Sequence, residues 1–273
     1  MNEEIPFLYF DYSKVPVLIT VFLSVLVLFA ARYFLFSLLY NFIFRRNRPE
    51  DDRRLLVKTD PGRRQMLREI RWAMISSVIF AVITILMIIG WQEGLIKIYL
   101  DWGAYPWWYV PLSIFLVLML HEAYYYWLHR WMHRPRIYRL IHKVHHDSVY
   151  TSVFTSFSFH PYESLLQAIF LPLVLMIIPI HLYLFIGLLV FMTVSATVNH
   201  AGVEVYPSGR IGKWMGRWLV GSTHHHVHHT RFRYNFGLYF TIWDKLMKTE
   251  NTDFEEEYAQ IIGASPEEGS LKV

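Results

Sequence analysis

The 273 residues include no cysteine, and this absence limits the chemistry that the chain can support. Disulfide bonds, iron–sulfur clusters, thiolate-ligated haem, cysteine nucleophiles and zinc sites of the finger type are all excluded. Any metal that the protein holds must therefore be bound by nitrogen and oxygen ligands, and histidine is the obvious donor.

Motifs that mark several common classes of enzyme are also missing. The chain has no GxGxxG or GxxxxGK(S/T) motif for nucleotides, no GxSxG elbow of a serine hydrolase and no HExxH of a zinc protease. It offers no domain large enough to hold flavin or haem. If the reaction needs electrons, we expect another protein to bring them.

Charged residues are sparse, at 18% of the chain, and the formal net charge is +4. Nothing resembles a nucleic-acid-binding module, and the basic residues lie in loops beside hydrophobic runs, as expected next to anionic lipid headgroups. The N-terminus (MNEEIPFLYFDYSK) is acidic, and the apolar run after it is too long for a signal peptide. We therefore expect no nucleic-acid partner and no cleavable signal.

Apolar residues, by contrast, make up 54% of the chain and form long runs that indicate membrane helices. Residues 15–44, interrupted by Arg32, exceed the roughly 20 residues that span a bilayer. A second span is predicted at 72–91, which has a tryptophan at each end. A third apolar run at 107–120 continues without a break into a histidine-rich stretch.

The last apolar segment, residues 165–198, predicts a helical hairpin that returns to the side it left, because Pro172, Pro179 and His181 interrupt it. We interpret His181 as structural. Each arm has only about 14 to 16 residues, so whether the hairpin crosses the membrane fully stays open.

Charge bias orients these helices. Residues 45–71 hold ten Lys or Arg and are predicted to be cytoplasmic, whereas the nearly neutral segment 92–106 suits the far side. The histidine-rich segments then lie on the cytoplasmic face. We expect an all-α, integral-membrane helical bundle of about three spans plus the hairpin, with a cytosolic helical cap that carries the histidines.

Three histidine clusters, HRWMH, HKVHH and HHHVHH, are the main chemical feature of the sequence. On a helix, residues three and four positions apart share a face, so each cluster presents several imidazoles together. Close-spaced imidazoles are costly to desolvate and repel one another when protonated, and a cation bound by neutral rings removes both costs. The shared faces comprise His129 and His133; His142, His145 and His146; and His225, His228 and His229.

These eight imidazoles are more than one tetrahedral zinc can use, which predicts two metal ions. Iron fits an imidazole-rich site without thiolates, although ligand type alone leaves zinc and copper open.

Other histidines are candidates by position alone. His160, in SFHPYE, and His200, in VNHAGVE, are single residues that could be ligands or supporting groups. His224 lies four residues before His228, which favours it as a ligand, whereas His226 points to another face of a helix.

Three polar residues are candidates for supporting roles. Glu122 is our candidate catalytic residue: it lies seven residues before His129, close to the same helix face, and could accept the imidazole N–H that a metal leaves free. Capping a helix or pairing with an arginine is the alternative. Asn235 and Asp244 are interpreted as polar groups that shape the site, with solvated loop residues as the alternative, and His121 is interpreted as structural.

The three clusters, with HPYE and NH between them and NFGLYFTIWDKL after them, resemble the fatty acid hydroxylase and sterol desaturase superfamily of integral-membrane, non-haem di-iron oxygenases. The resemblance covers about residues 66–249, and three histidine boxes in order at matching spacing make it specific. Within the family, GSTHHHVHHTRFRYNFGLYFTIWDKL is most similar to the C-5 sterol desaturase (lathosterol oxidase) branch.

This resemblance implies a ligand set and cofactors. Two iron ions would bind at the histidine boxes, with O2 as co-substrate. Glu122 stands where the family usually carries Asp, and His226 stands where the sterol branch has no histidine. The implied ligands are His129 and His133 in the first box, His142, His145 and His146 in the second, His225, His228 and His229 in the third, and the further family histidines His160, His200 and His224.

The implied activity is O2-dependent oxidation of an unactivated C–H bond in a lipid that enters from the bilayer. Hydroxylation and desaturation both fit, and the substrate, its binding residues and the oligomeric state stay open. Electrons would come from an external carrier, such as a cytochrome b5- or ferredoxin-type reductase system. The membrane would be the endoplasmic reticulum in a eukaryote or the inner membrane in a bacterium.

Two other classes of protein remain as alternatives. A membrane zinc hydrolase would need only three ligands per metal and an open water position. A metal transporter would bury its ligands at mid-membrane, whereas here the clusters follow the spans. We divide the chain into an N-terminal helix and basic loop (1–71), an oxidoreductase domain (72–249) and an acidic tail (250–273).

Overall fold

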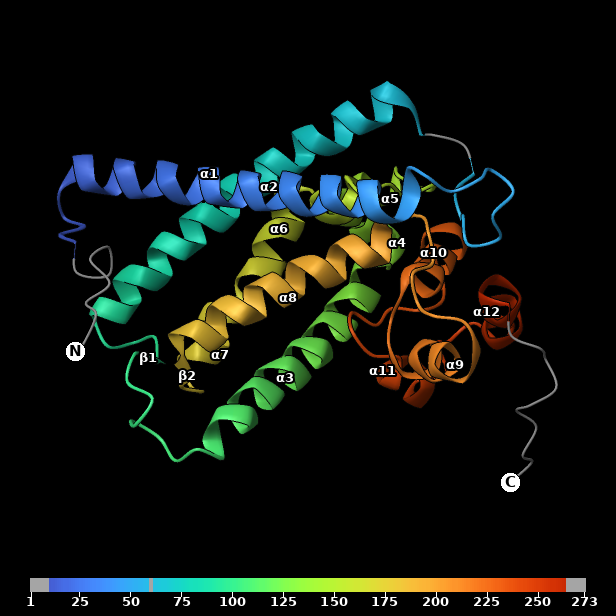
Figure 1. Cartoon of the computed structure of the whole chain (residues 1–273). Coiled ribbons are helices and arrows are strands. Elements are labelled where there is room, and N and C mark those ends of the chain that lie inside the picture. The colour runs from blue at the N-terminus through green and yellow to red at the C-terminus, as the bar shows by residue number, and fades with distance from the viewer. Residues whose placement is uncertain (1–9, 59–60, 264–273) are drawn as a thin grey trace.

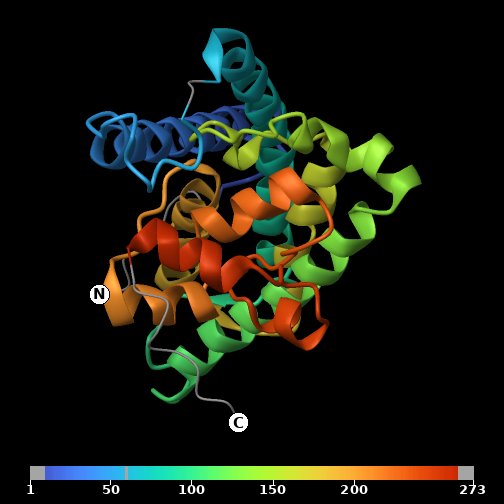
Figure 2. The ribbon, with the colours of Figure 1, turned by 90° about the vertical axis from the view of Figure 1, so that its right-hand side faces the viewer.

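The structure is a computed structural model that describes residues 10–58 and 61–263, and almost all of its regular structure is helical (Figure 1). The predicted all-α class is confirmed. Four long helices form the body of the molecule: α1 (Val15–Tyr40), α2 (Gly62–Gln92), α3 (Tyr109–Met132) and α8 (Leu182–His200). Four shorter helices gather at one end of them (Figures 1 and 2): α9 (Gly209–Trp218), α10 (Ser222–Arg231), α11 (Ile242–Leu246) and α12 (Phe254–Ile262).

Within the described part of the chain, three helices are long and apolar enough to cross a membrane. They are α1 together with the π-helical turn η2 (Asn41–Arg45), α2, and α8. The outer face of α1 leaves large apolar side chains uncovered, with Val27 66% and Leu28 64% exposed. Such a surface suits lipid as its surroundings, which supports the predicted membrane-protein class.

The third helix of this set is α8, and not the run at 107–120 on which the sequence analysis placed a span. That run does begin a 24-residue helix, α3, but the second half of α3 (HEAYYYWLHRWM) is polar and lowers its hydropathy. α8 has 19 residues because it begins directly after His181 and continues to His200. This arm is longer than the 14 to 16 residues that we expected.

The predicted hairpin is present. Its outgoing arm consists of α6 (Pro161–Ala168) and α7 (Phe170–Leu175), and α8 returns toward the end from which α6 left (Figure 1). At the turn, β2 (Ile180–His181) pairs in parallel with β1 (Ile98–Tyr99). The His181 side chain accepts a hydrogen bond from the Tyr183 amide and so caps α8, in agreement with a structural role.

Short elements between α3 and α6 carry the second histidine cluster: α4 (Pro135–Ile137), the π-helix η3 (Tyr138–His142), α5 (Lys143–His146) and η4 (Thr155–Phe157). The basic loop after α1 lies at the same end of the bundle. Leu55 forms an isolated antiparallel bridge with Val203, and the Arg54 guanidinium donates to the Tyr206 carbonyl at 2.5 Å. The basic loop and the histidine-bearing helices therefore share one end of the molecule.

Candidate metal centre

Nine of the histidines converge in two adjacent groups. Within each group, one ring nitrogen from every member lies within 4.8 Å of those of the others. The groups adjoin each other, since the ring centroids of His146 and His229 are 4.5 Å apart. The first group contains His129, His133, His142, His146 and His228, and the second contains His145, His200, His225 and His229.

Helical spacing divides the second and third clusters between the two groups. In the second cluster, His142 and His146 turn to the first group and His145 to the second. In the third cluster, His228 turns to the first group, whereas His225 and His229 turn to the second. α5 and α10 therefore lie beside both groups, while α3 supplies only the first and α8 only the second.

The Nε2 atoms point at one another. His146 Nε2 lies 3.1 Å from His142 Nε2 and 3.1 Å from His228 Nε2. Since His142 Nδ1 contacts the Glu163 carboxylate and His228 Nδ1 the Tyr234 carbonyl, each Nδ1 carries the proton and each Nε2 presents a lone pair. One proton on His146 Nε2 can satisfy only one of these two neighbours. A cation at the centre of the rings satisfies all of them.

The spacing of the nitrogens also fits a metal. In the second group, Nε2 of His200 lies 2.9 Å from that of His225 and 3.2 Å from that of His145. Two imidazole nitrogens bound to one ion at about 2.1 Å lie roughly 3.0 Å apart at a right angle and roughly 3.4 Å apart at a tetrahedral angle. The observed spacings of 2.9 and 3.2 Å are close to these values, so the Nε2 atoms lie near enough to one another to bind a single ion.

Burial keeps the imidazoles in the form that binds metals. Desolvation, reinforced by neighbouring imidazoles, holds the pKa values of six fully buried histidines well below their usual range. These rings are neutral at physiological pH, and a neutral imidazole is the metal-binding form. The six are His142, His145, His146, His225, His228 and His229.

Glu163 is a supporting residue that the sequence analysis did not single out. Its carboxylate accepts a hydrogen bond from His142 Nδ1 at 2.8 Å, and both side chains are fully buried. A carboxylate in this position fixes the ring and raises its basicity toward a metal. The signal was present, because Glu163 is the last residue of SFHPYE, and the Pro161–Ala168 helix that follows His160 turns it toward the second cluster.

Glu122 does not contact an imidazole as we expected. The His129 Nδ1 proton goes instead to the Phe236 carbonyl at 2.9 Å. The Glu122 carboxylate, 2% exposed, accepts hydrogen bonds from the backbone amides of Leu238, Tyr239 and Phe240. Those three amides compete more strongly for the carboxylate than a ring already paired with a carbonyl.

His160 and His224 lie outside both groups, although the sequence analysis named them as ligands. His160 is at the N-terminus of α6, where its Nδ1 accepts from the Tyr162 amide. His224 is 1% exposed, and its Nε2 lies 4.0 Å from Asp244. His224 is one residue before His225 and therefore points about 100° away from it on α10.

Asn235 and Asp244 lie where the sequence analysis expected site-shaping groups. The Asn235 amide donates to the His224 carbonyl at 2.9 Å and its oxygen accepts from the Asn251 amide. Asp244 accepts from the amides of Phe236 and Gly237, each at 2.8 Å. Both residues therefore anchor the segment after the third cluster.

Two more buried carboxylates, neither of which the sequence analysis singled out, hold segments around the groups. Glu69 accepts from the hydroxyls of Ser148, Ser152 and Thr155 and so fixes the segment after the second cluster. Glu204 accepts from the amide and hydroxyl of Thr223, at the first turn of α10. No sequence pattern pointed to them, because their partners are distant in the chain.

The comparisons with known proteins agree with this geometry. The fatty acid hydroxylase family model matches residues 114–249, which include all nine grouped histidines. The chain belongs to the fatty acid hydroxylase family. No solved structure matches the chain.

Curated relatives within this family carry sterol-related names. The chain is 29% identical to lathosterol oxidase of Rattus norvegicus over 78% of this chain and 68% of the relative. It is 27% identical to a Delta(7)-sterol 5(6)-desaturase of Gibberella zeae over 75% of this chain and 60% of that relative. A putative Delta(7)-sterol-C5(6)-desaturase of Arabidopsis thaliana is 30% identical over 67% of this chain and 63% of that relative. Family and relatives together support a membrane-bound lipid oxidoreductase.

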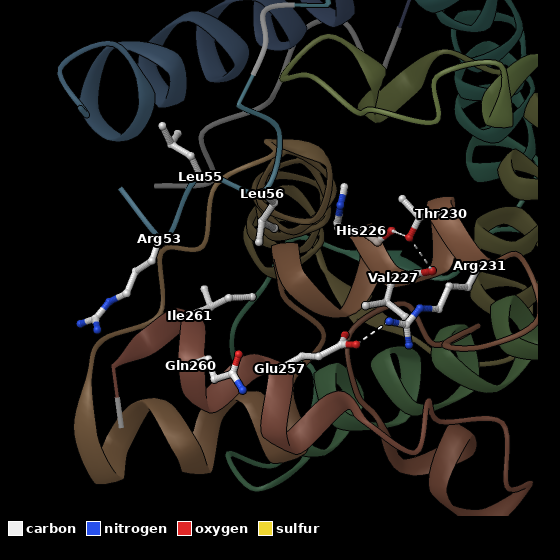
Figure 3. Close-up of a pocket in the computed structure, with 10 residues that line it drawn as sticks. All are labelled: Arg53, Leu55, Leu56, His226, Val227, Thr230, Arg231, Glu257, Gln260 and Ile261. Atoms are coloured by element: carbon white, nitrogen blue, oxygen red, sulfur yellow. Dashed lines mark hydrogen bonds and ion pairs between the residues drawn. The ribbon is translucent and has the colours of Figure 1, made fainter. Parts of the chain in front are cut away.

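The outer face of α10 points away from the two histidine groups and lines a cavity of about 400 Å³ (Figure 3). Residues of the basic loop and of α12 form the rest of the cavity wall. His226 and Thr230 project from α10 into its lining, and Arg231 forms an ion pair with Glu257 across it. His226 thus points away from the other third-cluster histidines, as its helical position predicted.

Proposed function

We propose that the chain is an O2-dependent di-iron oxidoreductase that hydroxylates or desaturates a C–H bond of a membrane lipid. The convergence of the Nε2 lone pairs on two centres carries this proposal. His129, His133, His142, His146 and His228 would hold one iron, and His145, His200, His225 and His229 would hold the other.

When bound, the two ferrous ions supply the means to reduce O2 and to oxidise an unactivated C–H bond. Hydroxylation consumes O2, two electrons and two protons, and yields an alcohol and one water. Desaturation consumes the same reactants, but two hydrogens leave the lipid and two waters form. The sequence has no motif that would hold a nucleotide redox cofactor, so an external carrier of the cytochrome b5 or ferredoxin type is part of the proposal.

The chain's own residues hold the ligands and exclude water. The carboxylate of Glu163 orients His142, while backbone carbonyls orient His129, His200 and His228. All four rings are at least nine-tenths buried, so water has little access to them. A preorganised, dry centre of this kind needs little rearrangement during the reaction.

We also propose that the centre faces the cytoplasm. The basic loop touches the histidine-bearing end through the Leu55–Val203 bridge, and basic loops stay on the cytoplasmic side. A lipid would then reach the centre from the cytoplasmic leaflet.

Sterols are the first substrates to test, because several relatives carry sterol desaturase names. The experiment combines metal analysis of the purified chain with O2 uptake and lipidomics of cells with and without the gene. We expect two irons per chain and O2 uptake that depends on lipid and reductant. A zinc-loaded protein that consumes no O2 would instead support the hydrolase alternative, and a hydroxylated acyl product would favour a fatty acyl substrate over a sterol.

A further inference from the structure

The segment that joins α10 to α11 touches the first histidine group on two sides. We call residues 234–240 the clamp loop. His228 Nδ1 donates to its Tyr234 carbonyl at 2.8 Å, and His129 Nδ1 donates to its Phe236 carbonyl at 2.9 Å. These two bonds set the ring planes of one histidine from α10 and one from α3, so the loop determines where both Nε2 atoms point.

The Phe236 side chain adds a second kind of contact. Its ring centroid lies 5.6 Å from that of His129, 5.2 Å from His133 and 5.5 Å from His228. All three rings belong to the first histidine group. Phe236 therefore closes one side of that group with an apolar surface.

The second histidine group is oriented by other means. His200 Nδ1 donates to the Ala196 carbonyl, one turn earlier in its own helix, at 2.7 Å. Among the described residues, the ring contacts of Phe236 reach no histidine of this group. The clamp loop touches only the neighbours of this group, since its Leu238 carbonyl accepts from the Asn199 amide side chain at 3.0 Å and its Tyr239 carbonyl accepts from the Val220 amide at 2.9 Å. A displaced clamp loop would therefore disturb the first group more than the second.

Glu122 holds one half of the clamp loop. Its Oε1 accepts from the Leu238 amide at 3.1 Å, and its Oε2 accepts from the amides of Tyr239 at 2.7 Å and Phe240 at 3.2 Å. Three donors on one buried carboxylate leave no position for an N–H of an amide side chain. In a glutamine at this position, the side-chain NH2 would face a backbone N–H, and two donors cannot form a hydrogen bond.

Asp244 holds the other half. Its Oδ1 accepts from the Phe236 amide at 2.8 Å and from the Thr249 hydroxyl at 2.7 Å, and its Oδ2 accepts from the Gly237 amide at 2.8 Å. Because Phe236 and Gly237 direct their amides to this carboxylate, the Phe236 carbonyl is left to face His129. The carboxylates thus act on the histidines through the backbone of the loop.

We propose that Glu122 and Asp244 are positioning residues that set the iron affinity of the first histidine group through the clamp loop and act on the second group much less. The inference rests on the proposed di-iron function. It gives Glu122 a role in holding the loop in place of the catalytic role that its sequence position suggested.

The test measures iron per chain in the full-length protein purified in detergent and loaded with ferrous iron alone. We expect two irons in the unaltered chain and about one in Glu122→Gln and in Asp244→Asn, with the weakened iron bound between ten- and a hundredfold less tightly. The conservative Glu122→Asp, which keeps two acceptor oxygens, should recover part of the lost iron. Thr249→Val removes the hydroxyl that donates to Asp244 and that also bonds to the Tyr126 hydroxyl. If the carboxylate variants do not fold, this milder variant should show a smaller loss of the same iron.

Double variants identify which iron is lost. His225→Ala removes a ligand of the second group, so adding Glu122→Gln to it should empty both groups. His133→Ala removes a ligand of the first group, so adding Glu122→Gln to it should change the iron content little. Ser113→Ala is the matched control, because it alters a fully buried polar residue of the same helix α3 whose hydroxyl donates to the Val110 carbonyl and not to the clamp loop; it should keep two irons.

Three results would overturn the inference while leaving the di-iron proposal intact. These are two tightly bound irons in Glu122→Gln and Asp244→Asn, equal loss from both groups, or a loss in Ser113→Ala as large as that in Glu122→Gln. An unaltered chain that binds no iron would contradict the proposed function itself.

Discussion

The Nε2 atoms of His200 and His225 lie 2.9 Å apart, although His200 ends α8 and His225 lies in the first turns of α10. The pair ties the returning arm of the hairpin to the third histidine cluster. It also explains why a single histidine far from any cluster belongs to the second group.

Replacing His225 by alanine should remove the iron of the second group and lower turnover more than about a hundredfold, because the group keeps only three imidazoles. Iron per chain and product formation are measured together. His226→Ala is the matched control on the same helix, since His226 faces the outer cavity, and it should keep both irons. Equal iron contents in the two variants would contradict the assignment.

The Glu163→Gln substitution should weaken iron binding about ten- to a hundredfold, since the ring of His142 would lose its charged partner. Competition with a chelator measures the affinity. Gln167→Ala provides the comparison, because Gln167 donates to the same Glu163 oxygen at 3.1 Å but touches no grouped histidine. If both variants bind iron alike, Glu163 has no special part in orienting His142.

The His160→Gln and His224→Asn variants should each retain two irons, because neither ring belongs to a group. Metal analysis after purification decides this. His224→Asn should reduce stability, since the residue is 1% exposed. An iron content near one in either variant would return that residue to the ligand set proposed from the sequence.

The iron-free protein should become less stable as the pH falls below about 6.5. Burial lowers the pKa values of the six histidines from the second and third clusters, so the unfolded chain binds more protons than the folded one below that pH. Each contributes up to about 1.4 kcal/mol for each pH unit below its unfolded value. Unfolding midpoints at pH 7.5 and 5.5, with and without iron, measure this, and equal midpoints without iron would refute it.

The absence of cysteine allows a direct test of orientation. Asp51→Cys, in the basic loop, and Ser208→Cys, before α9, should react with an impermeant maleimide from the cytoplasmic side. Gly103→Cys, between β1 and α3, should react only from the opposite side. Labelling of all three from one side would refute the proposed topology.

Much of this architecture could be predicted from local sequence. Apolar length predicted membrane helices, and two prolines and a histidine predicted the hairpin turn. The intervals of three and four residues predicted which histidines share a helix face. These inferences succeed because helix periodicity and hydropathy depend on residues close together in the chain.

The sequence by itself predicted an imidazole-rich metal site, built from three clusters at one end of a helical bundle. Only the tertiary structure decided which group each histidine joins, that His200 enters and that His160 and His224 stay outside. It also decided the partners of Glu163 and Glu122, which lie 21 residues and more than 100 residues away in the chain. Such pairings follow from how the helices pack, and no local pattern encodes that packing.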